Sequence, residues 1–537
     1  MEKILDTKSN HPQQRNIALL LDSFEVYAWE YSMLEQVINR QLGNISLIII
    51  NPDSKEKISD SKYALYHWFL KYQTKKYKVE NNAFSKVNTK KLLSKIPTIT
   101  SGKENLPQNT KIDLVIRLGF NAIPKELFSW SKFGIYAHHK ETTGIFTTPD
   151  GFWDVIHKTP TTKTNLYLLA ENQEDTTVIY ESQSSTHDVS VNHNMNTAYW
   201  KASLFIPRVL KKSQREDVEN SSIGKPLSKE SSTGSVSNMD FLFPLLKYFM
   251  NFVKRKISKK RTKENWVLLY SLENVNHPPF DFKKYKTLLP PNGIFWADPF
   301  IIERNNKFYI FLEACGTKIG AKGIISVIEM DKEGNHKPPV TILQKDYHLS
   351  YPFMFEWEND LYMIPETGQN ATIELYKCTD FPLQWKFQHT LMDSVMAYDS
   401  TLFFHDNKWW LFANMKQNKE MSSWDELYLF HADTPISQEW TPHPNNPIVS
   451  DVTTARPAGN IFIKDGKIYR PSQNSAYKYG YGLKINEITK LTESEYEEVT
   501  VESIEPHWDK SITTIHTYNK VGALTLIDGM FIKNNKI

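Results

Sequence analysis

Five polar residues recur at nearly even spacing in the second half of the chain. They are Asp298, Tyr351, Asp399, Arg456 and His516, separated by 53, 48, 57 and 60 residues. Each opens a strand-like segment, and four of these units close on a hydrogen-bond acceptor: Glu313, Glu366, Asn414 and Gln473. Carboxyl groups that gather in one cleft push their pKa values apart, which supplies an acid and a base at neutral pH. The pattern predicts a site for acid–base chemistry or for binding a polar ligand.

The unit that carries these residues reads as strand, two-residue turn, strand. Copies cover residues 296–313, 350–366, 398–414 and 456–473, and a weaker copy covers 516–528. In an antiparallel pair the start of the first strand lies beside the end of the second, so each opening residue should neighbour the closing residue of its own unit. The spacing suits one four-stranded blade per copy. We therefore predict an all-β, five-bladed β-propeller over residues 264–537, with these pairs around one mouth of its channel.

Two interpretations of this ring are open. As a binding site it would present Trp296, Glu313, Tyr351, Asn414, Arg456, Gln473 and His516 to a substrate, and the nearby Tyr398, Tyr477 and Tyr479 could stack on sugar rings. As a structural feature, the same residues would cap turns and strand ends between blades. The oxygen ligands of Asp298, Glu313 and Asp399 would suit a divalent ion. No EF-hand-like spacing supports such a site, however, so we predict no metal site.

The first part of the chain alternates apolar strands with helical patterns. Residues 16–22 and 45–51 are typical of buried strands, with a crossover helix over 25–39 between them. Residues 113–119 and 134–139 continue the series. This pattern predicts a doubly wound α/β domain with a parallel sheet over residues 15–212. No GxGxxG follows the first strand, so a dinucleotide cofactor has no support.

A polar stretch and a basic helix separate the two regions. Residues 213–240 are rich in Ser, Glu, Lys, Asn and Gly, which predicts a disordered linker. Residues 241–263 are first apolar and then basic, which predicts an amphipathic helix. It could pack on one domain with its basic end in solvent. Alternatively, Phe and Leu side chains of 241–261 could enter an anionic membrane surface, where the basic side chains would meet lipid: Lys254, Arg255, Lys256, Lys259, Lys260 and Arg261.

Overall composition narrows the function further. The 64 basic and 61 acidic residues give a formal charge of +3, so nothing favours nucleic acid as a partner. Cys315 and Cys378 lie in strand-like segments and form no metal-binding pattern, so we expect core thiols. Because neither an apolar leader nor about 18 consecutive apolar residues occur, we expect a cytoplasmic protein, with a peripheral position at the inner face of the membrane as the alternative.

The propeller region resembles two known groups. Its units are similar to the five-bladed propellers of arabinanases, invertases and levansucrases. It also resembles the N-terminal domain of the plant glucosamine inositolphosphorylceramide transferase family, through Phe295-Trp-Ala-Asp-Pro-Phe, Leu349-Ser-Tyr-Pro-Phe, Met363-Ile-Pro-Glu-Thr, Ser422-Ser-Trp-Asp-Glu-Leu and Ala455-Arg-Pro-Ala-Gly. The resemblance to the hydrolase propellers implies that Asp298 is a base or nucleophile, that Glu366 is an acid, and that Asp399 orients substrate or tunes a pKa. Tyr351 departs from the hydrolase pattern, in which an aspartate is expected.

The N-terminal region resembles the formyltransferase fold. The resemblance rests on residues 113–121, 134–139, the segment from Gly151 and the closing segment 196–210. It implies that 10-formyltetrahydrofolate is the cofactor and that His139 is catalytic. It also implies that Glu174 or Asp175 corresponds to the family's acidic residue and binds the cofactor. Ala137 stands where the family has an asparagine.

Three functions follow from these patterns. The first is a glycosyltransferase-like enzyme of glycan or polysaccharide biosynthesis, acting on a sugar nucleotide or glycan in the propeller funnel. The second is a sugar N-formyltransferase that uses 10-formyltetrahydrofolate, with the propeller as its substrate-binding module. The third is a glycan-binding protein without catalytic activity.

Overall fold

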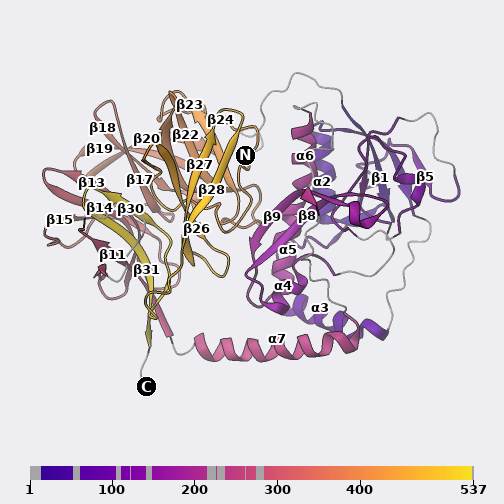
Figure 1. The fold of residues 1–537 in the computed structure, drawn as a ribbon, viewed down its shortest axis with the longest axis horizontal. Coiled ribbons are helices and arrows are strands. Elements are labelled where there is room, and N and C mark those ends of the chain that lie inside the picture. The colour runs from indigo at the N-terminus through magenta and orange to yellow at the C-terminus, as the bar shows by residue number, and fades with distance from the viewer. Residues whose placement is uncertain are drawn as a thin grey trace. The chain divides into compact units, whose positions relative to one another are not determined.

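The computed structural model describes residues 14–51, 61–104, 111–120, 122–140, 148–214, 225–226, 236–259, 262–273 and 284–534. The chain divides into two compact units, of which one ends at Lys254 and the other begins at Arg255. Figure 1 shows the two as a mixed α/β unit and an all-β unit.

The first unit is built on an eight-stranded sheet in the order β10-β9-β8-β7-β6-β1-β3-β5. The five strands from β5 to β7 run parallel, and β8, β9 and β10 continue the sheet in antiparallel pairing. The βαβ opening predicted over residues 16–51 is confirmed, because β1 pairs in parallel with β3 across helix α2. The strand bounds are β1 Asn16–Leu21, β3 Asn44–Ile50, β5 Thr98–Thr100, β6 Leu114–Arg117, β7 Ile135–Ala137, β8 Thr161–Leu169, β9 Thr177–Ser185 and β10 Lys225–Pro226.

Helices cover one face of this sheet. Leu19, Ile116 and Tyr136 share a core with helices α2 (Ala28–Asn39), α5 (Val191–Ala202) and α6 (Phe205–Ser213). In the described residues the other face is covered mainly by segment 120–130, which contains a single 3-10 turn, η2 (Lys125–Leu127). A doubly wound domain would carry helices on both faces. Here Pro124 and the serines that follow favour turns in the β6–β7 connection.

The start of the predicted crossover helix is extended instead. Residues Glu25–Tyr27 form strand β2, which pairs with β4 (Lys86–Asn88), and α2 begins only at Ala28. Val26 lies buried in the same core as α2. The alternation of exposed Glu25 and buried Val26 suits a strand, whereas the helical periodicity begins after Tyr27.

A third group of helices packs at one end of this unit. Helices α3 (Ala64–Lys76), α4 (Phe152–His157) and α7 (Asn238–Lys259) share an aromatic core. The predicted apolar and basic helix is therefore α7, and residues from Thr262 already form strand β11 (Thr262–Ser271). Within the predicted linker, β10 pairs with β9, whereas residues 215–224 and 227–235 lie outside the described residues. None of the helices described here is long and apolar enough to cross a bilayer.

The second unit is a five-bladed β-propeller, as the repeat predicted. Its blades are the sheets β13-β14-β15-β16, β17-β18-β19-β20, β21-β22-β23-β24, β25-β26-β27-β28 and β12-β11-β31-β29, with β30 also on β31. β13 contacts β17, β17 contacts β21, and β30 contacts β13, so the first strand of each predicted unit is innermost at these blades. In the fifth blade β11, from the start of the unit, pairs along its length with β31 from the end. This pairing closes the ring.

The propeller strands have the following bounds: β11 Thr262–Ser271, β12 Lys286–Leu288, β13 Ile294–Arg304, β14 Lys307–Gly316, β15 Ile324–Met330, β16 Val340–Leu343, β17 Ser350–Trp357, β18 Asp360–Glu366, β19 Thr372–Asp380, β20 Gln384–Asp393, β21 Met396–His405, β22 Lys408–Lys416, β23 Leu427–Ala432, β24 Thr441–Pro442, β25 Phe462–Lys464, β26 Lys467–Asn474, β27 Gly482–Leu491, β28 Tyr496–Ile504, β29 Ile512–Thr514, β30 Tyr518–Val521 and β31 Leu524–Asn534.

Tight hairpins join the first two strands of the blades. Asn305 and Asn306 both have positive φ, and so do Asp406 and Asn407. Two successive left-handed residues define the type I′ turn, which matches the twist of the strands it connects. In the second blade Glu358 and Asn359 form the same kind of turn, with φ of 51° and 66°.

Candidate functional site

Three of the recurring residues occupy a backbone bulge near the start of an innermost strand. Asp298, Tyr351 and Asp399 have φ values of 50°, 42° and 53°, and the pairing register shifts at each of them. A left-handed backbone costs a non-glycine residue roughly 1–2 kcal/mol. A bulge also changes the direction in which a side chain points. The same deviation in three blades indicates that the surrounding structure imposes it.

The predicted pairing of opening and closing residues is confirmed. Glu313 pairs with Ala297, next to Asp298. Glu366 pairs with Ser350, and Asn414 pairs with Tyr398. In the fourth blade the backbone N–H of Gln473 donates to the carbonyl oxygen of Arg456 at 2.8 Å. Opening and closing residues therefore meet at the same end of each blade.

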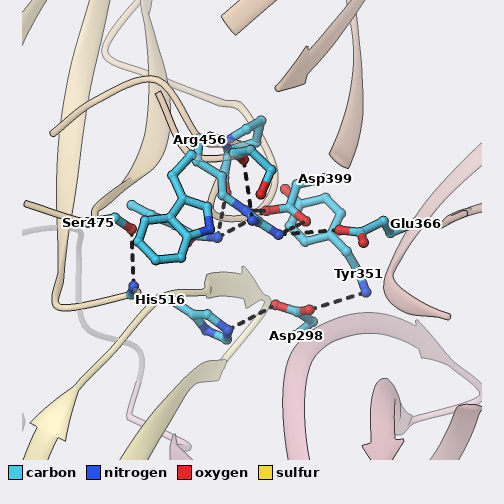
Figure 2. Close-up of polar contacts among 12 residues, drawn as sticks. Asp298, Tyr351, Glu366, Asp399, Arg456, Ser475 and His516 are labelled. Carbon is cyan, nitrogen blue, oxygen red and sulfur yellow. Dashed lines mark hydrogen bonds and ion pairs between the residues drawn. The ribbon is translucent and has the colours of Figure 1, made fainter. Parts of the chain in front are cut away.

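Arg456 joins carboxyl groups from two other blades. Its Nε donates to Asp399 Oδ2 at 2.5 Å, and its Nη2 donates to Asp399 Oδ1 at 3.1 Å and to Glu366 Oε2 at 3.3 Å. Gln473 Nε2 adds a hydrogen bond to Asp399 Oδ2 at 3.0 Å. These side chains are almost fully buried, and Figure 2 shows Arg456, Asp399 and Glu366 directed toward one another. A bidentate guanidinium–carboxylate pair is strong and fixed in geometry.

Glu366 is positioned to hold a proton. Burial and the neighbouring charge of Asp399 raise the pKa of Glu366 well above its usual range, and Arg456 opposes this shift only in part. These surroundings favour the protonated form of the Glu366 side chain. A neutral acid beside a buried ion pair can donate a proton to a bound molecule.

A second network surrounds Asp298. Thr517 Oγ1 donates to Asp298 Oδ1 at 2.7 Å, and the backbone N–H of Tyr351 donates to Asp298 Oδ2 at 3.3 Å. His516 Nε2 lies 3.7 Å from Asp298 Oδ1, and His516 Nδ1 lies 2.6 Å from Asp528 Oδ2. Figure 2 shows His516 and Asp298 directed toward each other.

Burial and the neighbouring charges together shift the pKa values of both Asp298 and His516 upward. Burial raises the pKa of Asp298 to about 6, with the His516 charge acting against the shift. Burial alone would lower the pKa of His516, but the carboxylates of Asp528 and Asp298 outweigh it, so the net pKa is raised. A pKa of about 6 leaves Asp298 mostly a carboxylate at neutral pH, whereas the raised pKa of Glu366 favours its protonated form.

One set of side chains in the described residues could hold a metal ion. Ligand atoms of Asp298, His516 and Asp528 all lie within 4.8 Å of one another. However, Asp528 already accepts backbone N–H groups of Asp298, His516 and Thr517 at 2.9, 3.0 and 2.8 Å. Internal hydrogen bonds therefore account for the placement of Asp528.

Two residues predicted to contact substrate are instead buried between blades. Trp296 is 2% exposed and packs in an apolar core with β14 and β15. Tyr351 is fully buried, and its hydroxyl bonds Thr401 Oγ1 at 2.9 Å and accepts the N–H of Gly459 at 2.8 Å. Tyr351 therefore connects the second, third and fourth blades. Asn414 and Gln473 are fully buried as well.

Partly exposed aromatic residues contact the buried networks. The Arg456 guanidinium lies 5.6 Å from the ring centre of Tyr398 and 5.0 Å from that of Tyr479. Trp424 lies beside Tyr479, with ring centres 5.5 Å apart. Trp266 stacks on His516 at 4.2 Å. These rings offer flat surfaces next to the polar centre.

Four of the residues around this centre were missed in the sequence: Asp528, Trp266, Trp424 and His348. Asp528 closes the fifth unit, so the rule that identified Glu313 would also have identified it. His348 lies 3.3 Å from Glu313 through Nε2 and Oε1. Trp266 belongs to β11, which precedes the first repeat in the sequence but pairs with β31 in the fifth blade. The repeat pattern therefore could not indicate that Trp266 lies at the site.

The N-terminal unit does not bring its predicted residues together. His139 is exposed and follows β7, at the carboxyl end of the parallel strands. Ala137 is buried within β7. Glu174 and Asp175 are exposed in a 3-10 turn beyond Leu169, and Leu169 pairs with Ile135 at the start of β7. They therefore lie toward the opposite edge of the sheet from His139.

Residues 286–532 match the protein family described as glucosamine inositolphosphorylceramide transferase 1, N-terminal. Similar curated proteins include glucosamine inositolphosphorylceramide transferase 1 of Oryza sativa subsp. japonica, 36% identical over 210 residues, or 38% of this chain and 28% of that protein. The protein of the same name from Arabidopsis thaliana is 31% identical over 216 residues, or 40% of this chain and 28% of that protein. The matched stretch thus spans just over a quarter of these relatives.

Solved structures with a similar chain path include glycoside hydrolases. The catalytic domain of the GH62 α-L-arabinofuranosidase of Coprinopsis cinerea has a TM-score of 0.34 at 10% identity, over 44% of this chain and 90% of that chain. Zg3597, a family 117 glycoside hydrolase from Zobellia galactanivorans, has a TM-score of 0.33 at 12% identity, over 50% and 91%.

Proposed function

We propose that the chain acts in glycan assembly, as a glycosyltransferase-like enzyme that binds a sugar substrate at the centre of the propeller. The observation that carries this proposal is the convergence of Asp298, Glu366 and Asp399 with Arg456 and His516, from all five blades, at one end of the innermost strands. Similarity to a family named for a glycosyl transfer supports the reaction class.

Glu366 and Asp298, whose pKa values are both raised, suit the two proton transfers of a glycosyl transfer. Glu366 would give its proton to the oxygen that leaves the anomeric carbon. Asp298 would take the proton of the acceptor hydroxyl as the oxygen of that hydroxyl forms the new bond to the anomeric carbon. Asp399 touches neither proton in this scheme, because Arg456 and Gln473 occupy its oxygens; it holds Arg456 in place and raises the pKa of Glu366.

The substrate would approach over the partly exposed rings of Tyr398, Trp424 and Tyr479, since the carboxyl groups themselves are buried. Aromatic rings next to hydrogen-bonding groups suit a sugar, which has both apolar faces and hydroxyl edges. The plant relatives are named for the transfer of an amino sugar, glucosamine, to an inositol-phosphate sphingolipid. Amino-sugar donors and inositol-phosphate acceptors are therefore among the first compounds to test.

The test is turnover of a panel of sugar nucleotides and acceptors by wild type, Asp298→Asn and Glu366→Gln. Each variant should lose about 10²-fold or more in turnover, because general acid or base catalysis contributes that much. Glu374→Gln is the matched control: Glu374 is equally buried in the second blade but lies in a separate hydrogen-bond cluster, and its turnover should stay near wild type.

Two results would contradict the proposal. One is transfer at wild-type rates in both variants, which would place the chemistry elsewhere. The other is saturable sugar binding in calorimetry with neither transfer nor release of sugar, which would establish the non-catalytic glycan-binding function instead.

A second candidate is N-formylation of an amino sugar with 10-formyltetrahydrofolate. The five parallel strands, with His139 after β7 at their carboxyl ends, favour a ligand at this edge. The described residues do not fit the cofactor's chemistry, however, because buried Ala137 offers no donor and Glu174 and Asp175 lie toward the other edge. A formylated product that His139→Ala abolishes would establish this function, and its absence with wild type would reject it.

A further inference from the structure

Helix α7 has two apolar faces, and the residues that the structure describes cover only one of them. Phe241, Leu245 and Tyr248 are buried against α3 and α4. Gln73 Nε2 of α3 donates to the hydroxyl of Tyr248 at 2.8 Å, and that hydroxyl donates to the carbonyl oxygen of Val189 at 2.5 Å. These contacts fix the rotation of α7 about its own axis, so the opposite face points away from this core.

The uncovered face carries a regular apolar stripe. Its members expose half or more of their surface and follow one another at intervals of three and four residues: Met239, Phe243, Leu246, Met250, Val253 and Ile257. That spacing places all six side chains on one side of the helix. Leu242 beside them is also exposed. We refer to these six residues as the α7 stripe.

The charges along the α7 stripe are of one sign. From residue 241 to residue 263 the sequence has eight basic residues and no acidic one. Lys247, Lys254 and Lys256 are exposed and directly follow or precede stripe residues. If two copies of α7 paired through this stripe, the lysines beside the stripe on one helix would lie close to those on the other. Their repulsion disfavours a second copy of the chain as the partner.

The neighbouring helix α3 extends the same character. Trp68 is 52% exposed and lies 6.5 Å from Phe249 between ring centres, and Lys76 lies over the ring of Phe252 at 3.9 Å. Lys71 and Lys75 of α3 are exposed, and residues 61–79 contain no acidic residue. Tryptophan and lysine beside an apolar surface are typical of the boundary between lipid headgroups and acyl chains.

We propose that the α7 stripe, together with Trp68 and the lysines of α3 and α7, binds the surface of an anionic lipid membrane. The apolar side chains would enter the acyl boundary, and the lysines would lie at the level of the anionic headgroups. This surface lies outside the propeller centre and does not depend on the function proposed for it.

The test uses the full chain and two kinds of vesicle, phosphatidylcholine alone and phosphatidylcholine mixed equally with phosphatidylglycerol. Sedimentation should show binding to the anionic vesicles at least about tenfold stronger than to the neutral ones, since each lysine near such a surface contributes on the order of 1 kcal/mol. Added salt should weaken the binding, because it screens these charges.

Two variants separate the contributions. Leu246→Glu with Val253→Glu places charge in the α7 stripe and should lower the affinity for anionic vesicles by about tenfold or more. Lys254→Glu with Lys256→Glu should remove the preference for anionic lipid. The matched control is Lys318→Glu with Ile319→Glu, an exposed basic and apolar pair in the propeller, which should bind like wild type. Thermal melting should be unchanged in all three, because every substituted side chain is exposed.

Three outcomes would overturn the proposal. Wild type could fail to sediment with anionic vesicles at low salt, or the stripe variant could bind them as well as wild type does. Alternatively, sedimentation velocity could show a dimer of wild type that the stripe variant converts to a monomer. That result would assign the α7 stripe to self-association.

Discussion

The centre of the propeller holds more carboxyl groups than cations. Arg456 and His516 face Asp298, Glu366, Asp399 and Asp528, and Glu313 is buried among them with the weakest compensation. Burial, followed by the charges of Asp298 and Glu366, raises the pKa of Glu313 well above its usual range. Its near neighbour His348 has a lowered pKa from burial, so it offers little positive charge at neutral pH. The raised pKa values of Glu313 and Glu366 favour their neutral forms, which cost less to bury than carboxylates do.

The raised pKa of Glu313 predicts a stability that falls as pH rises. Below its unfolded value of 4.5, both states are protonated and the group contributes nothing. Above that pH the unfolded chain releases the proton while the folded protein keeps it, so folding becomes less favourable. Glu313→Gln should therefore gain free energy of unfolding over wild type between about pH 4.5 and neutrality, reaching about 1–3 kcal/mol. Urea unfolding at a series of pH values measures this difference.

Glu374→Gln provides the contrast, because the two glutamates are equally buried but differ in their partners. Glu374 accepts hydrogen bonds from Tyr347, Tyr376, Asn370 and Thr372 at 2.6–3.0 Å. An amide accepts fewer of them, so this variant should lose about 1–3 kcal/mol at neutral pH. Equal effects of the two substitutions would show that burial alone, and not the charges around Glu313, determines the result.

At the scale of elements, the sequence revealed positions more reliably than side-chain directions. The two-residue turns and the polar opening and closing residues recur because every blade uses the same hairpin, so the register of Asp298, Asp399 and their partners could be read directly. The bulge beside Asp298 could not be read, and it decides which face the neighbouring side chains take. Trp296 was therefore expected at the site but lies in the core.

The same limit applies to the first unit. Continuous apolar runs such as Asn16–Leu21 indicate parallel strands, because a strand that is buried on both faces has no polar alternation. The covering of each face depends on long-range packing, which no local pattern encodes. The distance between His139 and Glu174 likewise depends on strand direction in the pair β7 and β8, and an antiparallel pairing there sends the two residues toward opposite edges.

Close contact between the fourth and fifth blades depends on one glycine. Gly459 has φ of 126°, and a Cβ at this position would lie 2.0 Å from the backbone oxygen of Tyr518. Gly459→Ala should therefore lower the free energy of unfolding by about 3 kcal/mol or more. Gly466→Ala is the matched control, since its φ is 77° but nothing lies within 4 Å of the added Cβ. It should cost roughly 1 kcal/mol, from backbone strain alone. Comparable losses in urea unfolding would rule out the steric explanation.

At the scale of the whole molecule, the described core clusters predict two separate unfolding transitions. Each cluster takes its residues from one unit: the sheet cores and the α3–α4–α7 core from the first, and the blade cores from the propeller. Because cooperativity follows the packed core, the units should melt independently in calorimetry. Leu114→Ala in β6 and Leu411→Ala in β22 each remove a fully buried side chain, which costs about 2–5 kcal/mol. Each should lower one transition by roughly 5–15 °C and leave the other in place. A single transition that both substitutions shift would instead show that the two units unfold as one.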